Sequence, residues 1–475
     1  MSEQPFIHLY RSPRGYYFYD VNKDTIVSIS KEIYAYLDHK IKYGDLKGED
    51  QKYVDELKDK GYLSDKHFLE IRHPELDNLE YLINNKCSQL ILQVTQACNL
   101  TCYYCPYANK SNGVLQRDHT NKMMSWDIAK SCIDFFYEHC KESEEVTISF
   151  YGGEPLIAFD LIKKAVEYAE DLFLGKQLSF GMTTNATLFN DKMIDFVAEH
   201  KFVVLFSIDG PEKIHDINRK KIDGKGSFKE AFRNMCKVIK RYDKDNSSFL
   251  RINMVLNPEN DVDEIISLFD EEIFKQYRIE VSSSPADDEF LEKEIKATES
   301  YRCKMTYQYF LALLDMMNLV ENLEIPPFIK AYSQELTKKY AHYKKPGLGL
   351  PDVGAPGGPC IPGQRKLFAD TEGKFYPCER VSEVSDVMKI GSVLEGIDLE
   401  KAANILDVAS ITSEKCKNCY AILHCTACAK SADAGDHFSA EQRLAHCIET
   451  YMAFNDEIQE CILLKESRTI YKRRG

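Results

Sequence analysis

Short apolar runs alternate with amphipathic segments between residues 88 and 283. The apolar runs have the length and composition of buried strands, and the segments between them repeat their apolar positions with helical spacing. Strands that alternate with helices predict an α/β fold with a parallel sheet and right-handed crossovers. Six such units suit either a partial β/α barrel or a doubly wound sheet. The predicted strands cover 90–95, 146–150, 178–183, 202–208, 250–256 and 278–283, and the predicted helices cover 125–140, 160–174, 191–200, 227–242 and 262–274.

The start of the chain has a different order, with strands before helices. Strand-like runs at 6–10, 15–19 and 25–28 precede helical segments at 31–39 and 49–60. Lys60 and Gly61 form a plausible end for the second helix. This order is typical of a compact winged-helix-like unit, so we expect a separate domain over residues 1–75. A purely structural appendage is the alternative.

The remaining segments predict a bridge and a region with little regular structure. Residues 294–323 have one apolar face and predict a helix, and the Pro- and Gly-rich stretch 345–359 marks a loop or domain boundary. Residues 360–450 lack continuous periodicity, so metal sites rather than a large apolar core could organise them. We therefore expect an α/β core over 88–285, a helical bridge over 286–358 and a further domain over 359–475.

Composition and charge narrow the class of protein. The chain has 475 residues, of which 44% are hydrophobic and 29% charged, as expected for a globular protein of two to four domains. A net charge of −14 argues against a general nucleic-acid-binding surface. There is no apolar stretch long enough to span a membrane and no secretory signal. We expect a cytoplasmic protein that binds neither nucleic acids nor membranes.

The chain contains 16 cysteines, which is a large number for a reducing compartment. Thiols stay reduced there, and clustered cysteines usually bind metal. Three cysteines are grouped near residue 100, and seven lie in the last quarter of the chain. The other six are expected to be small buried apolar residues. They are Cys87, Cys132, Cys140, Cys236, Cys303 and Cys461.

The first group, Cys98, Cys102 and Cys105, has the spacing C-x3-C-x2-C directly after the first predicted strand. Three thiolates on one loop can hold three irons of a 4Fe–4S cluster and leave the fourth iron open. A structural zinc would need a fourth protein ligand. None is close in sequence, and His119 is distant along the chain. With Tyr104 before the last cysteine, this loop resembles the signature of the radical S-adenosylmethionine (SAM) superfamily.

Further motifs follow the next predicted strands, and the resemblance implies their roles. Gly152, Gly153 and Glu154 match the GGE motif that binds the amino group of SAM, although a simple turn is the alternative. Asn185 lies in Thr-Asn-Ala, where the family usually has Thr-Asn-Gly. In the segment SIDGP…HDINR, Ser207 would donate a hydrogen bond to SAM and Arg219 would pair with its carboxylate. The alternatives are a surface ion pair for Arg219 and a turn cap for Asp209.

The resemblance also implies the partial (β/α)6 barrel and the chemistry. In the family, the reduced cluster gives one electron to SAM, and the resulting 5′-deoxyadenosyl radical abstracts a hydrogen atom. An electron donor such as a flavodoxin or a ferredoxin is then required. The alternative from another class is an iron–sulfur electron-transfer protein, against which the cysteine loop and the GGE motif both argue.

The seven later cysteines resemble the SPASM domain, which carries two auxiliary 4Fe–4S clusters. The resemblance implies a distal cluster held by Cys416, Cys419, Cys425 and Cys447 and a proximal cluster held by Cys360, Cys378 and Cys428. The family's last C-x3-C is C-x2-C here, which is a departure at Cys428. Two zinc ribbons are the alternative. Two closed clusters need eight thiolates, so one proximal iron would be open or would take another ligand, with Cys303 as a candidate.

The N-terminal unit resembles the small PqqD-type domain that recognises leader peptides, which commonly add a strand to a sheet edge. The combined resemblance implies a maturase of a ribosomally made peptide, with three 4Fe–4S clusters and SAM. The expected partner is a leader-bearing, Cys-containing precursor peptide, whose thiolate binds the open iron before a thioether forms. Attack at Cα would give a sactipeptide, and attack at Cβ or Cγ a ranthipeptide. Carbon–carbon crosslinking, oxidative peptide modification and anaerobic sulfatase maturation are the alternatives.

Overall fold

The structure is a computed structural model that describes residues 4–40, 46–107, 119–242, 248–286, 291, 294–357 and 360–472. Its centre is a ten-stranded sheet in which seven neighbouring strands run parallel. The α/β prediction is therefore correct, and all six predicted strands form. They are β5 Gln89–Thr95, β7 Glu145–Gly152, β8 Gln177–Thr184, β9 Val203–Ser207, β11 Leu250–Leu256 and β12 Glu280–Pro285.

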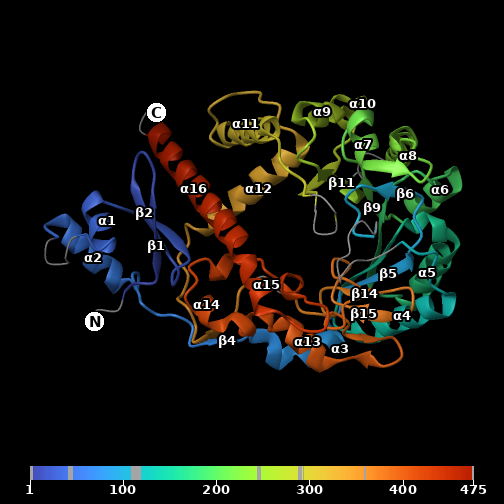
Figure 1. Cartoon of the computed structure of the whole chain (residues 1–475), viewed down its shortest axis with the longest axis horizontal. Helices are drawn as coiled ribbons and strands as arrows, with labels where there is room; N and C mark the ends of the chain where they lie inside the picture. Colours follow the sequence, from blue (N-terminus) through green and yellow to red (C-terminus); the bar gives the residue numbers. More distant parts are fainter. Residues whose placement is uncertain are drawn as a thin grey trace.

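Helices line the outer side of this sheet, on the right in Figure 1. Their apolar faces pack on the strands in one large hydrophobic cluster. Four match the predicted helices: α4 Trp126–His139, α5 Phe159–Leu172, α6 Asp191–Glu199 and α8 Phe228–Arg241. The helix expected over 262–274 is broken instead into α9 Val262–Ile266, a 3-10 turn and α10 Glu272–Gln276, because Glu271 takes an extended ψ of 137°.

The cysteine-rich region continues the same sheet. β14 Leu367–Ala369 pairs in parallel with β5, and three antiparallel strands follow it. They are β15 Lys374–Tyr376, β16 Gly391–Ser392 and β17 Gly396–Ile397. The sequence did not predict these strands, since two or three residues are too few to show alternation. The end of the Pro- and Gly-rich boundary, residues 358–359, lies outside the described residues.

The strands predicted at the start of the chain form, namely β1 Ile7–Arg11, β2 Tyr16–Asp20 and β3 Thr25–Ile29, in an antiparallel sheet of order β1-β2-β3. Two helices follow, α1 Lys31–Leu37 and α2 Glu49–Asp59. The sheet is buried on both faces because its side chains alternate between two clusters. Phe18 packs toward α1 and α2, whereas Tyr17 and Tyr19 pack toward the C-terminal part of the chain.

The partner on that second face is α16 Cys447–Lys472, a 26-residue helix that the sequence did not predict. Figure 1 shows it running beside the N-terminal sheet and across α12 Pro327–His342. The predicted helix at 294–323 is shorter, α11 Glu299–Met316. The other elements are β4 Glu70–Ile71, α3 Leu79–Asn85, β6 Leu100–Cys102, α7 Glu212–Asn218, β10 Arg219–Lys221, β13 Val353–Gly354, α13 Leu399–Leu406, α14 Ser413–Lys417 and α15 Ala440–Ala445.

No helix among the described residues is both long enough and apolar enough to cross a membrane.

Candidate active site

A cavity of about 270 Å³ opens at the carboxyl ends of the parallel strands. This is the edge where β/α folds place their sites. Ten residues that the sequence predicted as a cluster loop and a SAM site line it together. They are Cys98, Cys102, Tyr104, Cys105, Gly152, Gly153, Glu154, Asn185, Ser207 and Arg219.

The cysteine loop is fixed by a pair of strands that the sequence did not reveal. β6 pairs antiparallel with β10, so that Cys102 lies opposite Arg219. The Tyr103 amide also donates to the Asn218 carbonyl at 2.7 Å. The loop that follows the first barrel strand is thereby held against the segment that follows the fourth. This pairing brings the three thiols and the guanidinium into one cavity.

The two glycines of the GGE motif let protein backbones approach each other closely. The Gly153 amide donates to Thr95 O and the Glu154 amide donates to Ala97 O, both at 2.9 Å. A Cβ at Gly152 would lie 1.9 Å from Thr95 O, and a Cβ at Gly153 would lie 2.2 Å from Ala97 O. Both positions must therefore be glycine so that β7 can support the start of the cysteine loop.

Glu154 is fully buried and has one acceptor position to spare. Its Oε1 accepts from the Leu156 amide at 3.1 Å and from the Thr184 hydroxyl at 2.7 Å, and its Oε2 accepts from the Asn185 amide at 2.7 Å. Burial raises the pKa of Glu154 to about 7. A carboxylate offers about four lone-pair sites, so Oε2 has room for one more donor. An ammonium group such as that of SAM fits this requirement.

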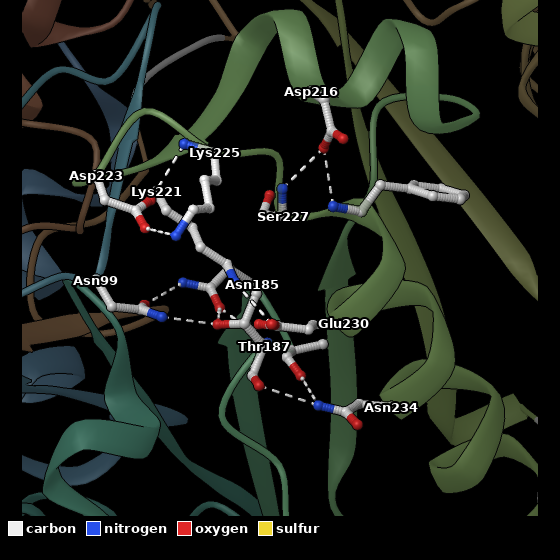
Figure 2. Close-up of polar contacts among 12 residues, drawn as sticks. Asn99, Asn185, Thr187, Asp216, Lys221, Asp223, Lys225, Ser227, Glu230 and Asn234 are labelled. Carbon is white, nitrogen blue, oxygen red and sulfur yellow. Dashed lines mark hydrogen bonds and ion pairs between the residues drawn. The ribbon is translucent and has the colours of Figure 1, made fainter.

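Asn185 is committed to contacts within the protein. Figure 2 shows its Nδ2 donating to Asn99 Oδ1 at 2.9 Å, while Asn99 Nδ2 donates to the Thr187 hydroxyl at 2.8 Å. Asn234 of α8 donates to the carbonyls of Ala186 and Thr187 from below. Asn185 Nδ2 also lies 4.0 Å from Cys98 Sγ. These contacts of Asn185 therefore attach the cysteine loop to the end of β8.

Ala186, which stands where the family usually has glycine, has a φ of 61°. This is the left-handed region, which an L-residue enters at a cost of about 1–2 kcal/mol. The glycine preference therefore has a backbone cause, and alanine is the smallest side chain that still accepts the conformation. Asn234 stabilises this backbone conformation by donating hydrogen bonds to the carbonyls of Ala186 and Thr187.

Arg219 and Asp209 form a buried ion pair, so the alternative of a surface ion pair for Arg219 is wrong. Arg219 Nε lies 3.0 Å from Asp209 Oδ2, and both side chains are almost completely buried. Tyr104 donates to the same carboxylate, and the Val255 amide donates to its other oxygen at 3.0 Å. Asp209 is thus a structural anchor. It leaves the Nη atoms of Arg219, one of them 3.9 Å from Cys102 Sγ, to face the cavity.

His119 is distant in sequence but lies at the cysteine loop in space. Its Nε2 is 3.5 Å from Cys105 Sγ and its Nδ1 is 3.0 Å from Gln96 O. Burial alone would raise the pKa of Cys105, but the contact with His119 lowers it. Burial raises the pKa of Cys98 and Cys102 to about 12, so these thiols must lose their protons when metal binds.

Three other cavity residues were missed because they sit inside strands. Tyr151, Asn253 and Ser284 lie on β7, β11 and β12 and line the same cavity. For Tyr151 and Asn253, a polar group in a largely apolar strand was the available signal, whereas Ser284 lies in a mostly polar strand. That signal is weak, since it shows neither the direction of a side chain nor its distance from the cysteine loop.

The four cysteines expected for a distal cluster line a second, small cavity of about 30 Å³. They come from α14, the turns after it and the start of α16. The buried Arg443 supports the cavity wall through Ala427 O and Thr412 Oγ1. Four thiols around one space match the donor set of a fully ligated iron–sulfur cluster. The donors are Cys416, Cys419, Cys425 and Cys447.

The three cysteines expected for a proximal cluster are more open. Cys360 and Cys428 are exposed and Cys378 is half-buried. Burial raises the pKa of Cys378, and Cys428 is close enough to contribute to the rise. Cys428 lines a different cavity from Cys425, although only two residues separate them. Cys360 Sγ lies 3.9 Å from an Arg365 amino group. The geometry therefore separates this set from the distal one.

Four of the six scattered cysteines are buried as predicted, namely Cys87, Cys132, Cys140 and Cys461. Cys236 is half-buried. The prediction is wrong for Cys303, which is exposed on α11. Helix α11 buries only Met305, Ala312 and Leu313, so its apolar composition does not mean that Cys303 is buried.

Residues 92–271 match the family described as the radical SAM superfamily. This part of the chain is a radical SAM domain. It contains the cysteine loop and every predicted SAM contact. The family match thus spans the part of the chain that supplies the cavity's predicted residues.

Two individual proteins match 32% and 70% of the chain. The chain is 39% identical over 153 residues to the uncharacterized protein MJ0907 of Methanocaldococcus jannaschii, a match that covers 32% of this chain and 49% of that protein. It spans, then, about half the length of that relative. It is 24% identical over 344 residues to a cysteine-type anaerobic sulfatase-maturating enzyme of Clostridium novyi, covering 70% of this chain and 84% of the enzyme.

The fold also matches a solved structure, native anSMEcpe with bound AdoMet. The TM-score is 0.56 at 20% sequence identity, and the match covers 78% of this chain and 99% of that chain. The likeness at this level of identity concerns the fold, and it extends well beyond the radical SAM domain.

Proposed function

We propose that this radical SAM enzyme forms thioether crosslinks in a leader-guided, Cys-containing peptide. The thiols of Cys98, Cys102 and Cys105 would hold a 4Fe–4S cluster, while Glu154 and Arg219 would bind the amino and carboxylate groups of SAM. SAM bound to such a cluster supplies a 5′-deoxyadenosyl radical that abstracts hydrogen. The protein's own part is to bind, orient and keep water from the reacting groups.

The observation that carries the thioether proposal is the cysteine count of the C-terminal region. Two closed clusters need eight thiolates, and the seven cysteines divide into a cavity lined by four and a more exposed set of three. Cys360, Cys378 and Cys428 would therefore leave one ligand position to a thiolate from elsewhere. Joining that sulfur to a carbon releases one hydrogen atom, one proton and one electron. A redox-active region close to the substrate is suited to take up the electron.

A groove on the N-terminal unit supports the peptide as substrate. It has a volume of about 440 Å³ and follows the edge of β3, between α2, α12 and α16. Lys60, Lys344 and Lys465 line it together with four tyrosines. The outward carbonyls of the edge are held by side chains, Ile26 O by Lys465 and Ser28 O by Tyr53. An extended peptide could replace these two contacts with its own amides.

Two measurements test the catalytic proposal. The reduced holoenzyme with SAM should produce 5′-deoxyadenosine, and absence of this product would contradict the assignment as a SAM-cleaving enzyme. Short Cys-containing peptides encoded beside the gene should change the electron paramagnetic resonance spectrum of the auxiliary clusters. Their Cys→Ser variants should not. Equal spectra with both peptides would exclude direct thiolate ligation.

A proline at the edge of β3 tests the recognition proposal. In an antiparallel pair, a residue whose carbonyl points outward also points its amide outward. Ser28→Pro therefore removes an outward N–H without breaking the bonds to β2, a position where proline is tolerated. The full-length precursor should bind at least about tenfold more weakly, a loss of about 1.4 kcal/mol. Ser28→Ala keeps the amide and should bind normally. Equal binding by both variants would place the leader elsewhere.

Sulfatase maturation is the second candidate, favoured by the similarity to the Clostridium novyi enzyme over 70% of this chain. Oxidation of a single residue, which this alternative implies, makes no bond between residues. Mass spectrometry of the treated peptide separates the two. A thioether lowers the peptide mass by two hydrogens, blocks one thiol from alkylation and joins two residues in the fragment spectrum, whereas oxidation of one residue leaves no joined fragments.

A further inference from the structure

One carboxylate and two imidazoles meet where three distant segments of the chain come together. Asp24 lies in the turn between β2 and β3, His342 is the last residue of α12, and His424 immediately precedes Cys425. His342 Nε2 lies 2.6 Å from Asp24 Oδ2, and His424 Nε2 lies 2.7 Å from Asp24 Oδ1. The potential ligand atoms of the three residues lie within 4.8 Å of one another.

Both imidazoles point a ring nitrogen at the carboxylate. They also meet edge to face, with ring centroids 5.8 Å apart and ring planes at 78°. Two ring nitrogens from different segments therefore point at one small, negatively charged space. A pair of ordinary hydrogen bonds would explain these distances, but it would not require the further contacts that surround the three residues.

Those contacts hold Asp24 and His424 in place. The Tyr19 hydroxyl donates to Asp24 Oδ1 at 2.7 Å and fixes the carboxylate. The Tyr343 hydroxyl lies beside the ring of His424, 3.5 Å from Nδ1 and 3.4 Å from Nε2, and it donates to Glu457. Hydrogen bonds from His424 and Tyr19 outweigh burial and lower the pKa of Asp24 to about 2.

The site is open on one side. The side chain of His342 is 51% exposed, whereas those of Asp24 and His424 are 18% and 11% exposed. An ion can therefore enter from solvent and keep a water as its fourth ligand. Bonds of about 2.0–2.1 Å in a tetrahedral site place ligand atoms about 3.3 Å apart. Small rotations of the two imidazoles away from the carboxylate supply the required opening.

We propose that Asp24, His342 and His424 form a binding site for a divalent transition-metal ion of the zinc class. Two imidazole nitrogens and one carboxylate oxygen suit zinc among the common divalent ions. The ion would join the N-terminal unit to α12 and to the cysteine-rich run. Asp24 is separated along the chain from His342 by 318 residues and from His424 by 400. The site is independent of the proposed thioether chemistry, because it uses none of the cluster cysteines.

The test is zinc content in the holoprotein, with iron and sulfide first reconstituted so that the cluster cysteines are occupied. After dialysis against micromolar zinc chloride and then against metal-free buffer, the wild-type protein should retain one zinc ion more than the His342→Ala and Asp24→Asn variants. Asparagine keeps the shape of aspartate and can still accept hydrogen bonds from the imidazoles. His437→Ala is the matched control, since His437 is exposed and pairs with its neighbour Asp436.

Both variants should bind zinc more weakly by more than about tenfold, with unchanged iron content. Zinc should also raise the melting temperature of the wild-type protein and of His437→Ala, but not that of the two site variants. A wild-type holoprotein that retains no zinc would overturn the proposal. Equal zinc retention by the wild type and both site variants would overturn it as well.

Discussion

At the scale of single residues, the position of the cysteine loop depends on two glycines. Gly152 and Gly153 touch the backbone of Thr95 and Ala97, and these contacts fix where the cysteine loop begins. The two glycines of the GGE motif thus contact the protein's own backbone, and Glu154 is the member of the motif that can bind the ligand. Substitutions of the glycines should therefore displace the cysteine loop, whereas substitutions of Glu154 should weaken ligand binding.

Gly153→Ala should displace the cysteine loop. The new Cβ would lie 2.2 Å from Ala97 O and 2.5 Å from Ala97 C, so the backbone has to move. We expect loss of the iron of one cluster and of SAM cleavage, with the auxiliary clusters retained. Gly224→Ala is the control, because nothing lies within 4 Å of its Cβ and its φ of +81° costs only about 1 kcal/mol. Full iron content in Gly153→Ala would show that the loop adapts.

Asp209→Asn should lower the free energy of unfolding and weaken SAM binding, although the two side chains have the same shape. The change leaves the Arg219 guanidinium buried without its counter-charge, and breaking a buried pair in this way costs about 3–5 kcal/mol. We expect a lower melting temperature and weak SAM binding in equilibrium dialysis. Asp223→Asn removes an exposed partner of Lys225 and should change neither. An Asp209→Asn protein that binds SAM normally would mean that Arg219 does not depend on this carboxylate.

At the scale of elements, the sequence identified the parts whose patterns are local. Six of the parallel strands and four of their helices appear where apolar periodicity predicts them. Helix α16 was not predicted, because its apolar positions contact two partners, the N-terminal sheet and α12, and do not gather in one stripe. The pairing of β6 with β10 joins residues more than 100 positions apart, and no local pattern shows it.

The same distinction applies to the site. Cysteines, glycines and a glutamate at fixed spacing are visible in one dimension, so the ten cavity residues could be predicted. His119 could not be placed, because its contact with Cys105 is made by the fold and not by the sequence spacing. The sequence identified Asp209 as a candidate, but it did not predict the buried ion pair with Arg219.

Helix α16 should hold the N-terminal unit in place through its buried face. Ile458 is fully buried against the cluster that contains Tyr17 and Tyr19, so Ile458→Ala should cost about 2–5 kcal/mol. We expect faster amide hydrogen exchange in β1 to β3. Leu463→Ala, on the exposed side of the same helix, should leave exchange unchanged. Equal exchange in both variants would show that the unit is held by other contacts.

At the scale of the whole molecule, the first set of cysteines lies apart from the other two sets. The first set lies on the loop after β5, and the distal four lie between the start of α14 and the start of α16. Of the proximal three, Cys360 precedes β14, Cys378 lies between β15 and β16, and Cys428 shares the run between α14 and α16. Because the distal set contributes no residue to the barrel cavity, its metal content should not depend on the first set. Loss of one set should then leave the others loaded.

Replacing Cys98, Cys102 and Cys105 together with alanine tests this independence. Three clusters contain about twelve irons, so the variant should keep about eight and lose all SAM cleavage. The sheet should remain folded, because its apolar core lies on the side away from the cavity. Cys303→Ser, an exposed cysteine outside the three sets, should keep full iron and full activity. Retained turnover in the triple variant would refute the assignment of the cavity. Complete loss of iron would show instead that the auxiliary sets depend on the first, against the separation of their supports in the fold.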